Sequence, residues 1–178
     1  VISGQTALTA EPDDTDEFLV SDAGTIKRID YSLIKGGGIT MADQFRLTSD
    51  ASTGSLTANL ERVDGTNQGT LGTGMSESSG VFTFPTTGIY LVRFSCIQYK
   101  DGDRRDIQIN IETTSNNSSY ANIGECITHI TRSASLTTNI QGMVETILDI
   151  TDTSNQKVRF ATFTDATILG SQQKIKHI

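Results

Sequence analysis

The segment Asp106–Glu112 constrains the fold of this 178-residue chain more than any other. Three isoleucines alternate there without exception with aspartate, glutamine, asparagine and glutamate. Because successive side chains of a β-strand point to opposite faces, this alternation predicts a strand with one face in a core and one face in water. Ile89–Cys96 instead carries apolar residues on both faces, which predicts a strand covered twice, the second time by a neighbouring subunit.

Extended segments recur at short, regular spacing from residue 39 onward, and clusters of glycine, serine, asparagine and aspartate separate them. Threonine is frequent, and β-branched residues favour strands. Such punctuation is typical of an all-β sandwich or barrel, and the sequence shows no internal repeat, coiled-coil heptad or long helix. The expected strands are 45–48, 55–63, 81–84, 89–96, 105–112, 120–131, 137–150, 157–163 and a last segment ending at residue 178.

The first 35 residues differ from the rest and predict a short hairpin. Phe18–Val20 and Thr25–Ile29 flank Ser21–Gly24, whose residues tolerate turn backbone angles. An isolated two-stranded hairpin is marginal in water, so we expect it to bury apolar side chains against copies of itself or the following domain. Gly36–Gly38 interrupts regular structure and predicts a linker. The expected domains are therefore a hairpin segment, 1–35, a glycine linker, 36–38, and a main domain, 39–178.

Charge and cysteine spacing exclude several functions. A net charge of −7 disfavours nucleic-acid binding, which needs clustered lysine and arginine. No segment approaches the roughly 18 apolar residues of a membrane span, so we expect no membrane insertion, although a targeting segment could precede Val1. Cys96 and Cys126 are too far apart for a CxxC motif. They either form a bridge worth roughly 3 to 4 kcal/mol or are two buried small apolar side chains.

The motifs of common active sites are absent, which predicts a non-enzyme with no catalytic residue, cofactor or metal. The two histidines, His129 and His177, accompany no GxSxG motif. Glycines 69, 72 and 74 lead into serines, whereas a phosphate loop leads into a helix. Among 21 acidic residues, pairs suited to glycan hydrolysis arise by chance, and glycan depolymerase activity stays open as an alternative.

Two loops are the candidate contact sites for a receptor. The first is a charged turn in which alternate aspartates also suggest calcium, but neighbouring arginine opposes a cation. The second is a polar loop whose tyrosine offers stacking area and whose amides offer hydrogen bonds to carbohydrate or protein. The candidates are Lys100, Asp101, Asp103 and Arg104 in the turn, and Asn116, Asn117 and Tyr120 in the loop.

Gly80–Phe94 resembles the strand–turn–strand signature of the complement and tumour-necrosis-factor-like jelly-roll family. Pro85 and Gly88 supply the turn between its two strands. The resemblance extends over residues 39–178 and implies a ten-strand jelly-roll that assembles as a tight homotrimer with aromatic strand residues near the threefold axis. The candidates for that role are Tyr90, Val92 and Phe94, which alternatively fill an intramolecular core. The last strand departs from the family pattern because it lacks aromatic residues.

Asp16–Tyr31 resembles a segment recurrent in fibre proteins of marine bacteriophages. This implies a component of a phage fibre, assembled in the host cytoplasm and located on the virion exterior. We expect its trimeric knob to bind a host-surface glycan or protein and other fibre, tail or capsid proteins to be partners. The alternatives are a structural virion protein without receptor binding, which decorates a capsid or connects a fibre, and a secreted cellular member of the jelly-roll family.

Overall fold

A computed structural model describes residues 6, 8–35, 37–102, 106–129, 133–163, 167–168 and 174–177. Side chains at 100–102, 133–138, 168 and 174–177 are outside this description. The chain divides into two compact units, Val1–Gly38 and Ile39–Ile178. Each unit is described by itself.

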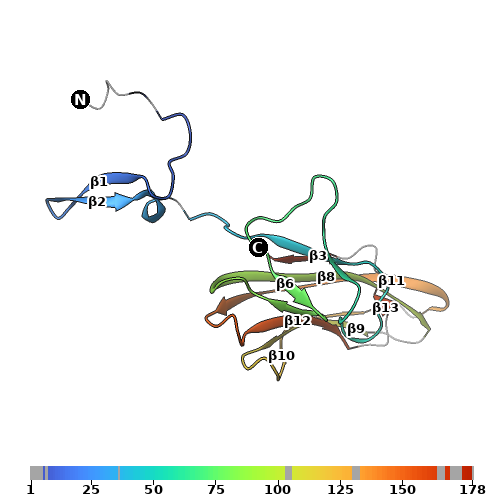
Figure 1. The fold of residues 1–178 in the computed structure, drawn as a ribbon. Coiled ribbons are helices and arrows are strands. Elements are labelled where there is room, and N and C mark those ends of the chain that lie inside the picture. Colours follow the sequence, from blue (N-terminus) through green and yellow to red (C-terminus); the bar gives the residue numbers. More distant parts are fainter. Residues whose placement is uncertain are drawn as a thin grey trace. The chain divides into compact units, whose positions relative to one another are not determined.

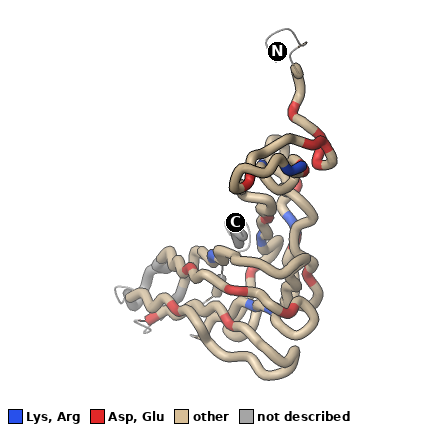
Figure 2. Tube along the Cα trace, turned by 90° about the vertical axis from the view of Figure 1, so that its left-hand side faces the viewer, with Lys and Arg blue, Asp and Glu red and all other residues tan. Residues whose placement is uncertain are grey.

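Unit 1 is a β-hairpin followed by one turn of 3-10 helix. β1 (Glu17–Asp22) pairs antiparallel with β2 (Thr25–Asp30) along all six residues of each strand. Ala23 and Gly24 join the strands with φ of 49° and 84°, the signs that a two-residue type I′ turn requires. The 3-10 helix η2 (Tyr31–Leu33) follows, and Figure 2 shows charges of both signs on this unit.

Unit 2 is a sandwich of two antiparallel sheets, whose layers are visible in Figure 1. Sheet I has the strand order β10-β9-β12-β7-β6, and sheet II has the order β11-β8-β14-β3-β5. These paths hold ten strands, which confirms the expected ten-strand jelly-roll; two short strands, β4 and β13, pair beside them with β12 and β8. The bounds are β3 Asp43–Leu47, β4 Gly54–Ser55, β5 Leu60–Arg62, β6 Ser76–Ser78, β7 Val81–Thr83, β8 Gly88–Gly102, β9 Asp106–Thr114, β10 Ala121–His129, β11 Ser133–Ile150, β12 Lys157–Thr162, β13 Thr167–Ile168 and β14 Lys174–His177.

The core lies between the two sheets and is built on phenylalanines from both. Phe82 contacts Phe45 and Phe160 edge to face, at ring distances of 4.9 and 5.3 Å. Phe94 lies 5.1 Å from Phe160, so one aromatic chain connects the layers. Such pairs add about 0.5–1.5 kcal/mol each beyond the area that they bury.

The isoleucines of β9 are buried as their alternation predicts, but its polar face is also largely buried. Asn110 and Glu112 are only 3% and 6% exposed, so the prediction that this face meets water is wrong for them. Glu112 accepts a 2.6 Å hydrogen bond from Arg159 Nε, and Asn110 accepts one of 3.0 Å from Gln108. Long side chains on neighbouring positions therefore cover the strand, and these bonds offset the cost of burying polar groups.

Tyr90, Val92 and Phe94 lie in the intramolecular core, the second of their two alternatives. Tyr90 is 6% exposed, and Val92 and Phe94 have no exposed surface. All three belong to the hydrophobic cluster of buried residues. The alternating residues of β8 lie on its other face, where Ile89 is exposed.

A buried carboxylate anchors the long loop between β5 and β6. The Asp43 side chain has no exposed surface and accepts hydrogen bonds from Arg62 Nε and Nη2 at 3.1 and 3.0 Å. It also accepts bonds from the Met75 backbone N–H at 2.8 Å and the Thr70 hydroxyl at 3.3 Å. One carboxylate thus ties both ends of the loop to β3.

Cys96 and Cys126 are both free thiols. Cys96 is buried in β8, and Cys126 in β10 packs partly buried against the same core. Burial, and then the neighbouring Cys126, raise the pKa of Cys96 to about 12. The structure therefore agrees with two small apolar side chains and not with a bridge.

We expect Asp43→Ala to lower the free energy of unfolding by about 3 kcal/mol, because it removes the shared acceptor of a buried network. The matched control is Asp64→Ala, which breaks an exposed ion pair with Arg46 and should cost less than about 1 kcal/mol. Urea unfolding of both variants measures the difference. Equal losses would contradict the anchoring role.

We expect Cys96 to resist thiol reagents at pH 8, since a pKa of about 12 leaves about one thiolate in ten thousand. Ellman's reagent should modify at most one thiol of the folded protein, Cys126, and two after denaturation. Cys96→Ala should leave the folded-state count unchanged. Two thiols modified rapidly without denaturant would contradict this assignment.

Candidate functional site

The structure separates the two predicted contact sites to opposite ends of the sandwich. Lys100 and Asp101 lie near the Gly102 end of β8, and only their backbone is described; Asp103 and Arg104 lie outside the described residues. Asn116, Asn117 and Tyr120 lie beyond the far end of β9, about 25 Å away for a strand of this length. The candidates therefore form two separate sites, and only the second has described side chains.

Asn116 holds the loop between β9 and β10 together. Its Oδ1 accepts hydrogen bonds from the Thr114 hydroxyl at 2.9 Å and from the backbone N–H groups of Ser118 and Ser119 at 3.0 and 2.8 Å. Asparagine forms such local bonds where the chain turns. The predicted contact residue Asn116 thus has a structural role, and it fixes the exposed residues around it.

A second loop, 151–156, lies against the first. The Asn117 backbone N–H donates to the Asn155 carbonyl at 3.1 Å, and Asn117 itself adopts a φ of 55°. Gln156 Oε1 accepts from the backbone N–H groups of Thr151 and Asp152, both at 2.7 Å. Hydrogen bonds from the Asn155 side chain and the Ser154 backbone lower the pKa of Asp152. Both loops are therefore held by their own polar groups.

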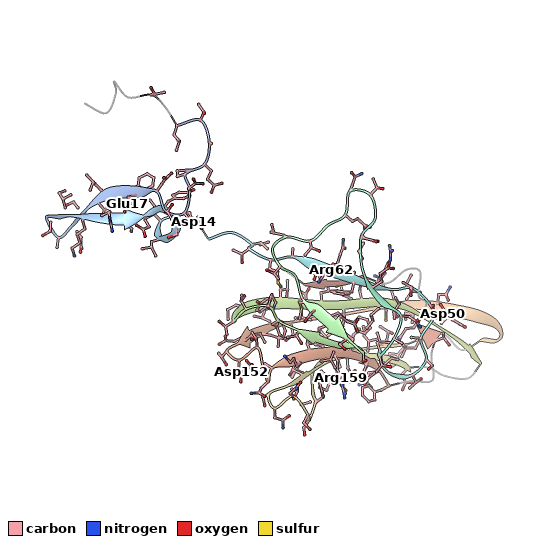
Figure 3. All side chains as sticks on the ribbon, viewed as in Figure 1. Asp14, Glu17, Asp50, Arg62, Asp152 and Arg159 are labelled. Carbon is pink, nitrogen blue, oxygen red and sulfur yellow. The ribbon has the colours of Figure 1, made fainter. Side chains whose placement is uncertain are left out.

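Tyr120 already uses one face of its ring. The Arg159 guanidinium carbon lies 3.9 Å from the ring centroid, and Arg159 in turn pairs with the buried Glu112. Burial raises the pKa of the Tyr120 hydroxyl, against the opposing effect of the Arg159 charge. In Figure 3, Arg159 lies on the side of the sandwich opposite Arg62. Tyr120 can therefore offer a ligand its edge or its second face only.

A cavity of about 210 Å³ opens between the sheets beside these loops. It is smaller than the roughly 300–1,000 Å³ of drug-sized sites, so it suits one small polar group. Hydroxyl, amide, charged and apolar side chains line it together. The lining residues are Thr113, Thr114, Ser115, Ser119, Ala121, Leu148, Asp149, Ile150, Gln156 and Lys157.

The outer faces of the two sheets differ in polarity. On sheet I, Glu125 Oε2 accepts hydrogen bonds from the side-chain amides of Gln108 and Asn122, both at 3.1 Å. On sheet II, Ile147 is 70% exposed and lies opposite the half-buried Leu91. The face of sheet II formed by β8 and β11 is called the apolar face here, and its members are Ile89, Leu91, Ile97, Met143 and Ile147, with the Arg93–Glu145 ion pair among them.

Sequence reasoning named β8 as doubly apolar but missed Met143 and Ile147 on β11. They alternate with the more buried Val144, Thr146 and Leu148. Within the described residues, no three His, Cys, Asp or Glu side chains gather as a metal site. In the same part of the chain, no helix is long and apolar enough to span a membrane.

We expect Asn116→Ala to destabilise the loop by about 1–2 kcal/mol, because three donors lose one acceptor. Asn116→Asp keeps the Oδ1 acceptor and should retain most of the stability. Thermal unfolding and amide exchange at Ser118 and Ser119 measure both variants. An Asn116→Ala protein as stable and protected as the parent would contradict the structural role.

Comparison with known proteins supports the fold. No protein-family model matches the chain, and no curated protein is significantly similar in sequence. Among solved structures, the chain is similar to Eiger TNF from S. frugiperda, with a TM-score of 0.59, 12% identity and coverage of 76% of this chain and 89% of that one. Murine APRIL gives a TM-score of 0.54 at 9% identity, with coverage of 77% and 96%. The chain therefore contains a jelly-roll of the tumour-necrosis-factor type.

Proposed function

We propose that this chain is a phage fibre component on the virion exterior, in which unit 2 assembles as a trimeric knob that attaches the virion to the host surface. The observation that carries the proposal is the apolar face of sheet II. The resemblance of Asp16–Tyr31 to phage fibres supports the fibre, and the resemblance of Gly80–Phe94 to trimeric jelly-rolls supports the trimeric knob.

The apolar face has the properties of a surface that another copy covers. Ile89 and Ile147 are 68% and 70% exposed, and Leu91 lies beside both. Burying such a side chain contributes about 1.5–3 kcal/mol, so a few of them in each copy favour association. The Arg93–Glu145 pair satisfies its own charges at 2.6 Å and can enter an interface without an unpaired ion.

The two hydrogen-bonded loops are the proposed contact surface for the host. Residues 115–119 are exposed hydroxyl and amide groups, and their backbone is fixed before any ligand binds. Preorganised groups lose little conformational entropy on binding. Three copies around one axis act at a high effective concentration, so weak single contacts become firm attachment.

One observation favours the alternative of a structural virion protein. Asp43 of β3 lies opposite His177 of β14, which lies opposite Val92 of β8. β3 therefore begins near the Gly88 end of β8, and the candidate loops lie at this same end. Loops at the end where the chain enters unit 2 are suited to contact neighbouring fibre parts.

We expect Ile147→Asp to convert the protein from three times the 19.2 kDa chain mass to a monomer, because a buried carboxylate opposes association. Ile127→Asp is the matched control, since Ile127 is a 50% exposed strand isoleucine on sheet I. Light scattering with dilution measures both. A wild-type monomer at high concentration would overturn the trimeric knob.

The two functions differ in what the labelled trimer binds. Attachment predicts binding to some strains in a panel of intact bacteria, reduced at least tenfold in Ile147→Asp by the loss of multivalency. The structural alternative predicts binding to isolated fibre or capsid proteins and none to cells. Turnover of surface polysaccharide would instead support the depolymerase.

A further inference from the structure

The hairpin of unit 1 buries too little of its own surface to be stable alone. Its two strands have only six residues each, and an isolated two-stranded hairpin is at best marginally stable in water. Leu19, Ile26 and Leu33 are 78%, 65% and 74% exposed. In the described part of unit 1, these two strands pair with no further strand.

Polar contacts within the hairpin do not make up this deficit. Its ion pairs, Lys27–Asp22, Arg28–Glu17 and Lys35–Asp14, are exposed on both partners. Such pairs contribute about 0–1 kcal/mol. The aromatic contact of Phe18 with Tyr31, at 6.0 Å between ring centroids, involves a Phe18 that is itself partly exposed. A hairpin with this regular six-residue pairing therefore needs stabilising contacts from a partner outside the hairpin.

The register shows which backbone groups such a partner can reach. The two-residue turn makes Asp22 and Thr25 a hydrogen-bonded pair, and the 2.7 Å bond from Tyr31 N to Asp16 O fits the same alternation. Every second pair is then non-hydrogen-bonded, with N–H and C=O groups directed outward. The outward amides belong to Glu17, Leu19 and Ser21 on β1 and to Ile26, Arg28 and Asp30 on β2.

The two outer edges differ in charge. β1 carries Glu17 and Asp22 and no basic residue, whereas β2 carries Lys27 and Arg28 with Asp30. Within each hairpin the acidic residues of β1 already pair with the basic residues of β2, and a β1–β2 contact between copies would repeat this arrangement of opposite charges. Like edges would place similar charges together, which disfavours a twofold contact of β1 with β1.

We propose that the β1 edge of one copy pairs with the β2 edge of the next, so that three hairpins close into one antiparallel ring. This inference rests on the threefold self-association of unit 2. A head-to-tail contact closes into a ring under threefold rotation and leaves no free edge. Glycines 36–38 join each hairpin to its unit 2, and short linkers between two binding modules give effective concentrations of about millimolar.

Residue-resolved hydrogen exchange on the full chain tests this pairing. In the trimer, the outward amides of Leu19, Ser21, Ile26 and Arg28 should exchange at least about 100-fold more slowly than in an unstructured peptide. In monomeric Ile147→Asp that protection should disappear. Outward amides that exchange freely in a proven trimer would overturn the pairing and leave the knob intact. Protection that persists in the monomer would assign the partner to the same chain and overturn it as well.

Ser21→Pro gives a second test, because it removes one outward N–H and no inward one. Proline is tolerated on an edge whose N–H meets water but not on a paired edge. We expect this variant to lose protection across the hairpin while the native mass stays trimeric, and Ser21→Ala to behave as the parent. Unchanged protection in Ser21→Pro would contradict the pairing. A wild-type protein that is not a trimer would instead remove the proposed function on which it rests.

Discussion

The pairing of β8 with β11 determines most of what unit 2 can do. Their register runs continuously from Gly88 opposite Ile150 to Lys100 opposite Thr138, and it assigns the described side chains of residues 89–99 and 139–150 to one of two faces. Tyr90, Val92 and Phe94 fall on the core side, and Ile89 and Leu91 on the outer side. A slip of one residue would exchange these faces. The same register therefore fixes the aromatic core and the surface available to another copy.

The two outer faces differ in polarity because adjacent strands place different kinds of side chain next to one another. On sheet I, polar side chains from adjacent strands bond to one another, as Arg159 does with Glu112, and the 50% exposed Ile127 lies among these polar groups, opposite Gln108. On sheet II, Ile147 meets Leu91 and gains only partial cover. Large exposed apolar surface on one sheet marks an interaction site more reliably than scattered apolar residues. This asymmetry is the physical basis for placing the contact between copies on β8 and β11.

The sequence predicted features that depend on local pattern and missed those that depend on neighbours. Alternation identified β9, and Pro85 with Gly88 identified the turn between β7 and β8. It left open which face of β8 is internal, because both faces are apolar and only the opposite sheet decides. The strand β6, Ser76–Ser78, has no apolar residue that would signal it. The sequence predicted Asn116 as a contact residue only. Its structural role was missed because its bonds to Thr114, Ser118 and Ser119 form only when the loop folds back.

The hairpin extends this distinction from strands to subunits. Ala23 and Gly24 specify its turn, and the turn specifies its register, so its conformation is encoded locally. Its stability is not encoded locally. The free energy contributed by exposed ion pairs and two paired strands is smaller than the conformational entropy cost of ordering about thirty residues. A segment with a defined shape and insufficient stability is suited to order when copies meet. Under the proposed assembly, unit 2 brings the copies together and the hairpins supply the edges, so the hairpin becomes ordered only in the trimer.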